Sequence, residues 1–150
     1  MDQPGNGAGL EYLMGGGLGH LSNAVRNAIF EQLEKELAPL ELTSAQFIVV
    51  IGAMRGRART VNEFCAFAGV DAGSMSRLLD RLEAKDIVRR VRDGADRRQV
   101  QVELTAKGAA LSPQIMPAIE RVYTRFLKGF SEADASQLQL LLQRLLANAG

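Results

Sequence analysis

The chain has 150 residues, of which 47% are hydrophobic, and a formal net charge of +1. This size and composition fit one domain, or two lobes that share a core, and exclude a disordered or fibrous chain. Its apolar clusters are far shorter than the roughly 20 residues that span a bilayer, and no secretory signal pattern is seen. We therefore expect a soluble, cytoplasmic protein without a membrane partner.

One cysteine and one histidine limit the chemistry that the chain can perform. A lone cysteine cannot close an intrachain disulfide, and the two residues together are too few for a Cys/His zinc site. The usual catalytic pairings are scarce, and no glycine-rich phosphate loop follows a strand. We expect a protein that is not an enzyme and that holds no metal or cofactor.

Charge is distributed unevenly along the chain. Residues 55–98 contain 11 Lys and Arg against 7 Asp and Glu, a net charge of +4, whereas the remaining residues carry a net charge of −3. A basic centre between acidic ends suits a DNA-facing segment, although a solvated charged surface produces the same excess.

Glycines crowd residues 1–17, which we expect to form a flexible N-terminal arm. Apolar residues then recur every three or four positions and predict a long helix over residues 18–37, ended by Pro39. Two capping-box signatures, each placed before an apolar run, predict short helices over residues 43–55 and 60–68.

A third short helix begins near Asp71, and its outer face favours contact with DNA. Its buried stripe is expected to consist of Met75, Leu78, Leu79 and Leu82. The opposite face then carries Gly73, Arg77, Asp80 and Ala84, flanked by Ser76 and Arg81. Its first turn is small and polar, which lets a helix approach base edges, while arginine can reach guanine or phosphate.

From Ile87 the apolar pattern changes to a period of two. Residues 100–104 alternate strictly, and residues 88–92 can pair with them across a polar loop at 93–96, which predicts a β-hairpin. Its arginines are Arg89, Arg90, Arg92, Arg97 and Arg98. Counterion release favours such a cluster near phosphates, and a solvated charged face is the alternative.

The C-terminal third is predicted to be helical. A helical region from Thr105 to about Phe130 contains Pro113 and Pro117, which predict a kink or an interruption. Ser131 resembles the start of a capping box, and the last helix carries a wide leucine stripe typical of a core or a dimer interface.

Three helices followed by a hairpin is the order of a winged helix-turn-helix. The sequence also resembles the MarR family of bacterial transcription regulators over roughly residues 18–146. The most specific part is the hairpin running into Leu-Thr-x-Lys-Gly. The segments that carry the resemblance are residues 42–47, 60–64, 74–83, 96–98 and 102–108.

The resemblance implies a mainly α fold with a small β-hairpin wing and N- and C-terminal dimerisation helices. Residues 18–40 and 106–150 would form the dimerisation helices, and residues 41–105 the winged helix-turn-helix DNA-binding domain. One departure is visible, because the chain reads Lys85-Asp86-Ile87 where the family usually has Lys-Gly-Leu. We expect Asp86 to adopt a positive φ, which Asp tolerates better than most residues.

Carried over by position, Arg97 or Arg98 would enter the minor groove, oriented by Asp96, while Ser74, Ser76 and Arg77 would lie at the major groove. Arg81 and Arg92 complete the DNA-facing set that we predict. Family members often bind small aromatic acids between the dimer base and the DNA-binding lobe. His20, Arg26 and Phe47 are the candidate ligand-binding residues, and a plain surface role is the alternative for His20.

The leading hypothesis is a homodimeric, ligand-responsive repressor that binds double-stranded DNA at a pseudo-palindromic operator. One alternative is a winged-helix module that binds protein without sequence-specific DNA binding. Another is a redox-switched regulator that uses Cys65, although this cysteine lies in an apolar stripe and is expected to behave as a small buried hydrophobe.

Overall fold

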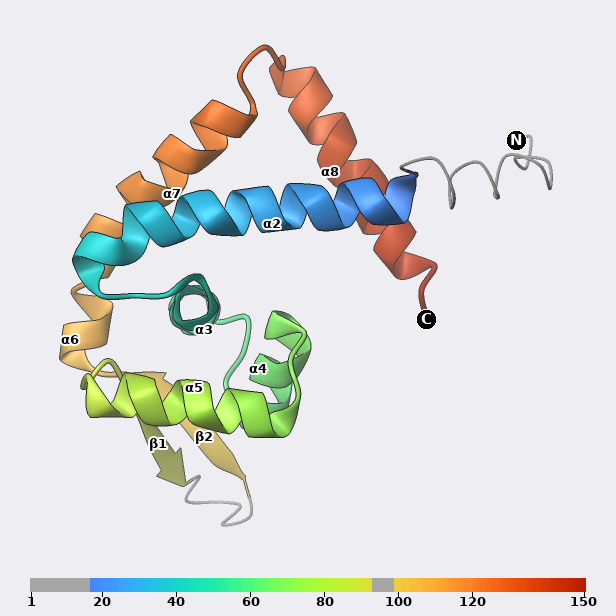
Figure 1. The fold of residues 1–150 in the computed structure, drawn as a ribbon. Coiled ribbons are helices and arrows are strands. Elements are labelled where there is room, and N and C mark those ends of the chain that lie inside the picture. The colour runs from blue at the N-terminus through green and yellow to red at the C-terminus, as the bar shows by residue number, and fades with distance from the viewer. Residues whose placement is uncertain (1–16, 93–98) are drawn as a thin grey trace.

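The computed structural model describes residues 17–92 and 99–150, arranged as in Figure 1. In chain order the elements are α2 (Leu18–Leu37), the 3-10 helix η1 (Ala38–Leu40), α3 (Ser44–Met54), α4 (Val61–Ala68), α5 (Ala72–Ala84), β1 (Val88–Arg92), β2 (Val100–Leu104), α6 (Ala106–Ala109), α7 (Ser112–Phe126) and α8 (Glu132–Ala147). The predicted fold class, mainly α with one hairpin, is confirmed. The arm expected over residues 1–17 lies, except for Gly17, outside the described residues.

Side-chain caps set the starts of the helices. The hydroxyls of Thr43, Thr60 and Ser131 each accept a hydrogen bond from the backbone N–H three residues later, and the side chain of that later residue accepts one in return. These capping boxes are the ones that the sequence predicts. Because a cap needs only four consecutive residues, it forms wherever the local sequence supplies it.

The predicted interruption after residue 105 is confirmed. α6 ends after a single turn, and α7 begins with Pro113 in its first turn, where a missing N–H costs no helical hydrogen bond. Pro117 lies inside α7. The helix ends at Phe126, earlier than the expected Phe130.

The hairpin is attached to the helices at its inner end. β1 and β2 pair antiparallel with Val88 opposite Leu104. The N–H of Val102 donates to the carbonyl oxygen of Arg59 at 2.7 Å, and Thr60 forms an isolated bridge with Gln101. The strands are therefore fixed to the segment that leads into α4.

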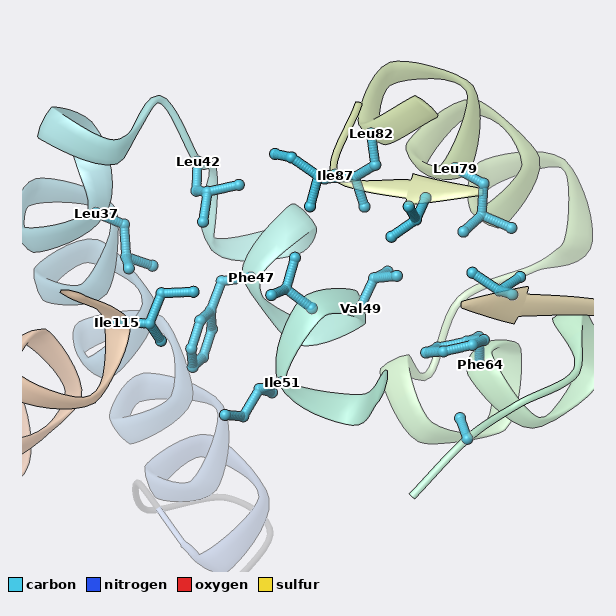
Figure 2. Close-up of a cluster of buried hydrophobic side chains, with 14 of the residues drawn as sticks. Leu37, Leu42, Phe47, Val49, Ile51, Phe64, Leu79, Leu82, Ile87 and Ile115 are labelled. Carbon is cyan, nitrogen blue, oxygen red and sulfur yellow. The ribbon is translucent and has the colours of Figure 1, made fainter. Parts of the chain in front are cut away.

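A single hydrophobic cluster joins α2, α3, α4, α5, both strands and α7, whereas α6 and α8 contribute no residue to it. Figure 2 shows Leu37 of α2 and Ile115 of α7 on one side of α3, and Phe64 of α4 and Leu79 of α5 on the other. We call α2, α7 and α8 the base, and residues 41–105 the central lobe. Because α3 packs against both, the base and the central lobe share one core.

Candidate nucleic-acid interface

The helix α5 presents the outer face that the sequence predicts. Met75, Leu79 and Leu82 are fully buried, and Leu78 is partly buried against the same cluster. The exposed residues of the opposite face are Gly73, Ser76, Arg77, Asp80, Arg81 and Ala84. The first turn of α5 is therefore open, with small side chains and an arginine.

A short chain of hydrogen bonds organises this first turn. Asp71 accepts from the backbone N–H of Ser74 at 2.8 Å and from its hydroxyl at 2.9 Å, and these bonds lower the pKa of Asp71. The Ser74 hydroxyl accepts in turn from Nη2 of Arg77 at 3.2 Å. Half-buried Ser74 therefore orients Arg77, while Ser76 stands exposed.

Arg90 ties the hairpin to α5. Its guanidinium donates to Oδ1 of Asp80 at 2.8 Å, to Oε2 of Glu83, and to the carbonyl oxygen of Ser76 at 3.2 Å. Its backbone N–H donates to Oε1 of Glu83 at 2.8 Å. Burial opposes the charge, but the two carboxylates outweigh it and raise the pKa of Arg90.

The pairing of Arg90 corrects one part of the sequence interpretation. We counted Arg90 among five hairpin arginines available to phosphate, but its side chain is only 26% exposed and is bound to α5. The sequence could not reveal this, since Arg90 and Asp80 meet only once the turn between α5 and β1 has formed. Arg90 fixes the angle between hairpin and helix instead.

Exposed cations remain on both elements. Arg89 pairs with Glu103 across the strands at 3.1 Å, whereas Arg81 and Arg92 form no ion pair within the described part of the chain. Asp96, Arg97 and Arg98, the predicted minor-groove group, lie outside the described residues. Asp86 has a φ of 57°, as its place in the turn after α5 predicts.

The three candidate ligand residues do not come together. Arg26 lines a hollow of about 190 Å³ between α2 and the central lobe, and its guanidinium lies 4.4 Å from the centre of the Phe30 ring. The other lining residues are Ser44, Ala45, Ile48, Ala68, Val70 and Leu78. Phe47 is 8% exposed and belongs to the core, and His20 is exposed on α2, so that neither lines this hollow.

Residues 17–92 and 99–150 contain one cysteine and one histidine. Cys65 is a free, half-buried thiol packed against the core. No three His, Cys, Asp or Glu side chains gather in a way that could hold a metal ion. No single helix there combines the length and apolar character of a bilayer crossing, although the bent pair 18–40 and 44–54 meets both criteria jointly.

Comparison with known sequences gives consistent results. A sequence model described as MarR family matches residues 39–99. The multiple antibiotic resistance protein MarR of Escherichia coli (strain K12) is 32% identical over 130 residues, which cover 86% of this chain and 90% of that protein. The HTH-type transcriptional repressor NicR of Pseudomonas putida is 27% identical over 139 residues, covering 89% of this chain and 86% of that one.

Solved structures agree. Wild-type apo MarR from E. coli superimposes with a TM-score of 0.73 at 32% identity, covering 86% of this chain and 96% of that one. A mutant MarR from E. coli complexed with operator DNA superimposes with a TM-score of 0.79 at 29% identity, covering 91% of this chain and 96% of that one.

Helix α5 with its exposed first turn, and the hairpin bound to it, define a winged helix-turn-helix regulator of transcription that binds DNA. The chain belongs to the MarR family. Of the relatives named above, NicR is described as a transcriptional repressor.

Replacing Arg90 by Met should lower the free energy of unfolding by about 1–3 kcal/mol, because half-buried Glu83 loses its charged partner. Arg89→Met is the matched control, since its pair with Glu103 is exposed and is expected to contribute less than about 1 kcal/mol. Urea denaturation at one protein concentration measures both variants. Equal losses in the two would contradict the role assigned to Arg90.

Proposed function

We propose that this protein is a ligand-responsive repressor that binds a pseudo-palindromic operator as a homodimer. The observation that carries the proposal is the pairing of α5 with the hairpin through Arg90, which presents an open helix start and exposed arginines as one rigid surface. A MarR structure with operator DNA supports the same use of this fold.

In this proposal α5 is the recognition helix and the hairpin is the wing. Ser76, Arg77 and Arg81 face the major groove, with Ser74 orienting Arg77. Arg92, at the outer end of β1, faces the flanking phosphates. At the wing tip we assign Arg97 or Arg98 to the minor groove and Asp96 to the orientation of that arginine.

The base needs a second copy to cover it. Helix α8 has no buried residue, and an isolated helix of this length is only marginally stable in water. Apart from Phe67, the large hydrophobic side chains that are exposed among the described residues lie on the base and on the loop between α7 and α8. They are Leu18, Leu21, Val25, Met116, Tyr123, Phe130, Leu138, Leu140, Leu141, Leu142, Leu145 and Leu146.

Residues 18–40 and 106–150 are therefore assigned to dimerisation, and residues 41–105 to DNA binding. Figure 1 shows the loop between α7 and α8 on the side of α2 opposite the hairpin, with α8 crossing α2 near the start of that helix, far from the strands. A two-fold dimer presents two recognition helices to half-sites about one helical turn apart. Occupation of a promoter in the cytoplasm then blocks transcription, and the repressor from P. putida supports this mode.

The hollow beside Arg26 supports a small aromatic acid as effector. Arg26 supplies a cation for a carboxylate, and Phe30 supplies an aromatic wall. Its volume is below the roughly 300–1,000 Å³ of pockets for drug-sized ligands, which suits a single ring. Since the hollow is lined by both α2 and the central lobe, a ligand there favours one arrangement of the two.

The double variant Arg97→Ala, Arg98→Ala should bind an operator selected from random duplexes at least ~10-fold more weakly than wild type, because minor-groove and phosphate contacts are lost. Fluorescence anisotropy at several salt concentrations should also show a salt slope smaller by about one to two. Lys35→Gln is the control, since it removes a positive charge from an exposed position of α2, outside the proposed DNA surface, and should keep the slope. Unchanged affinity of the double variant would refute the wing assignment, and salt-independent wild-type binding would favour the protein-binding alternative.

Leu141→Glu combined with Leu145→Glu should convert the dimer to a monomer, because it buries two carboxylates in an apolar interface. Sedimentation velocity measures the change. Gln143→Glu adds a charge to an exposed position on the same helix and should leave the dimer intact. A monomeric wild-type protein, or a double variant that stays dimeric, would disprove the proposed interface.

Salicylate or benzoate at millimolar concentration should release wild-type protein from its operator. Arg26→Gln should require at least ~10-fold more acid, since a charge-assisted hydrogen bond contributes about 1.5–3 kcal/mol. Lys35→Gln, at an exposed position of the same helix, is the control in the anisotropy titration. Equal sensitivity of wild type and Arg26→Gln would remove the hollow as the effector site.

A further inference from the structure

We propose that Lys85 is a positioning residue for DNA recognition, which ties the C-terminal end of α5 to the connection between α2 and the central lobe. Lys85 follows directly after α5. Its Nζ donates to the carbonyl oxygen of Glu41 and to Oε1 of Gln46 at 3.1 Å. Glu41 ends η1 in a left-handed conformation, with φ of 55°, and lies between α2 and α3.

The acceptor on α3, Oε1 of Gln46, is held in place by its own contacts. The side chain of Gln46 is only 3% exposed, and its Oε1 also accepts from the backbone N–H of Thr43 at 3.2 Å. A buried amide oxygen is stabilised when it receives hydrogen bonds, since each one compensates for lost water. Lys85 therefore meets a position set by the capping box of α3 and is directed away from the proposed DNA surface.

The same turn is held from its other side by α6. Nζ of Lys107 donates to the carbonyl oxygen of Lys85 at 2.9 Å. The hydroxyl of Thr105 lies within hydrogen-bond distance of the carbonyl oxygen of Asp86, at 2.5 Å, and of the carbonyl oxygen of Ile87, at 3.2 Å. Gly108 packs so closely that a β-carbon at this position would overlap the carbonyl oxygen of Ile87. The glycine is required for this approach.

These contacts bring both chain connections between base and central lobe to one place. The first connection enters α3 through Glu41, and the second leaves β2 through Thr105 towards α7. Both contact the turn of residues 85–87 at the end of α5. A change in the base therefore reaches α5 at this turn, and the fixed ends of the turn set the direction of the helix.

Small angles at the turn produce large displacements at the tip of α5. The helix has 13 residues and a length of about 20 Å at 1.5 Å per residue. A rotation of 10° about the turn moves its first residue by about 3 Å, enough to lose hydrogen bonds to base edges. In the proposed dimer, the Lys85 tie thus fixes the spacing of half-sites that the two helices accept.

This inference rests on the proposed function, and operator spacing tests it. Binding is measured by anisotropy to the selected operator and to the same half-sites separated by one further base pair. Wild type should lose about 100-fold in affinity on insertion, a loss comparable to one or two mismatched base pairs. Lys85→Met keeps the aliphatic stem but donates no hydrogen bond. For this variant the inserted base pair should lower the affinity by less than about 10-fold.

Three controls distinguish the loss of the Lys85 hydrogen bonds from other causes of a changed spacing penalty. Lys85→Arg, which still donates, should restore the spacing penalty, and Lys35→Met, which changes an exposed lysine of α2, should behave as wild type. The salt slope of Lys85→Met should match wild type, because no phosphate contact is removed. If circular dichroism shows Lys85→Met unfolded, Lys85→Ala, which also donates no side-chain hydrogen bond, takes its place.

Equal spacing penalties in wild type and the folded variant would overturn the proposal, as would a salt slope reduced by about one, which would make Lys85 a phosphate contact. Wild-type protein that binds without any spacing preference would instead refute the dimeric operator complex itself, and the inference with it.

Discussion

The burial of α3 is the constraint on which the rest of the structure depends. Six of its eleven residues are buried, from Gln46 to Gly52, so the helix packs on both sides at once. The base contacts one side of α3, and α4, α5 and the strands pack around the other (Figure 2). Because packed interiors are dense and transmit displacement, α3 joins the base mechanically to α4, α5 and the strands.

Electrostatic pairing decides which cations of the basic centre are available to DNA. Arg90 is bound to two carboxylates of α5, and Lys85 is bound to Glu41 and Gln46. These two side chains therefore fix the positions of the hairpin and of α5, and they are not available to phosphate. The exposed arginines of α5 and β1, among them Arg81 and Arg92, are the cations that the proposed DNA complex would use. A positive net charge along a segment thus overstates the number of phosphate contacts that it can make.

Two features close to the base contact α5 at different points. The hollow beside Arg26 includes Leu78, near the middle of α5, whereas Lys85 holds its C-terminal end. An effector in the hollow and the tie at the turn would act on the same rigid helix. In this arrangement a ligand need only favour one angle between base and central lobe, and the fixed turn converts that angle into a position of the helix tip.

The sequence by itself determined the features that depend on neighbours along the chain. Helix starts at Thr43, Thr60 and Ser131 were predictable because each cap is complete within four residues, and the inner and outer faces of α5 followed from helical periodicity. Only the tertiary structure decided the partners of Arg90 and Lys85 and the burial of Phe47. Lys85 and Gln46 stand 39 positions apart, and no local rule relates them until packing around α3 brings them within hydrogen-bond distance.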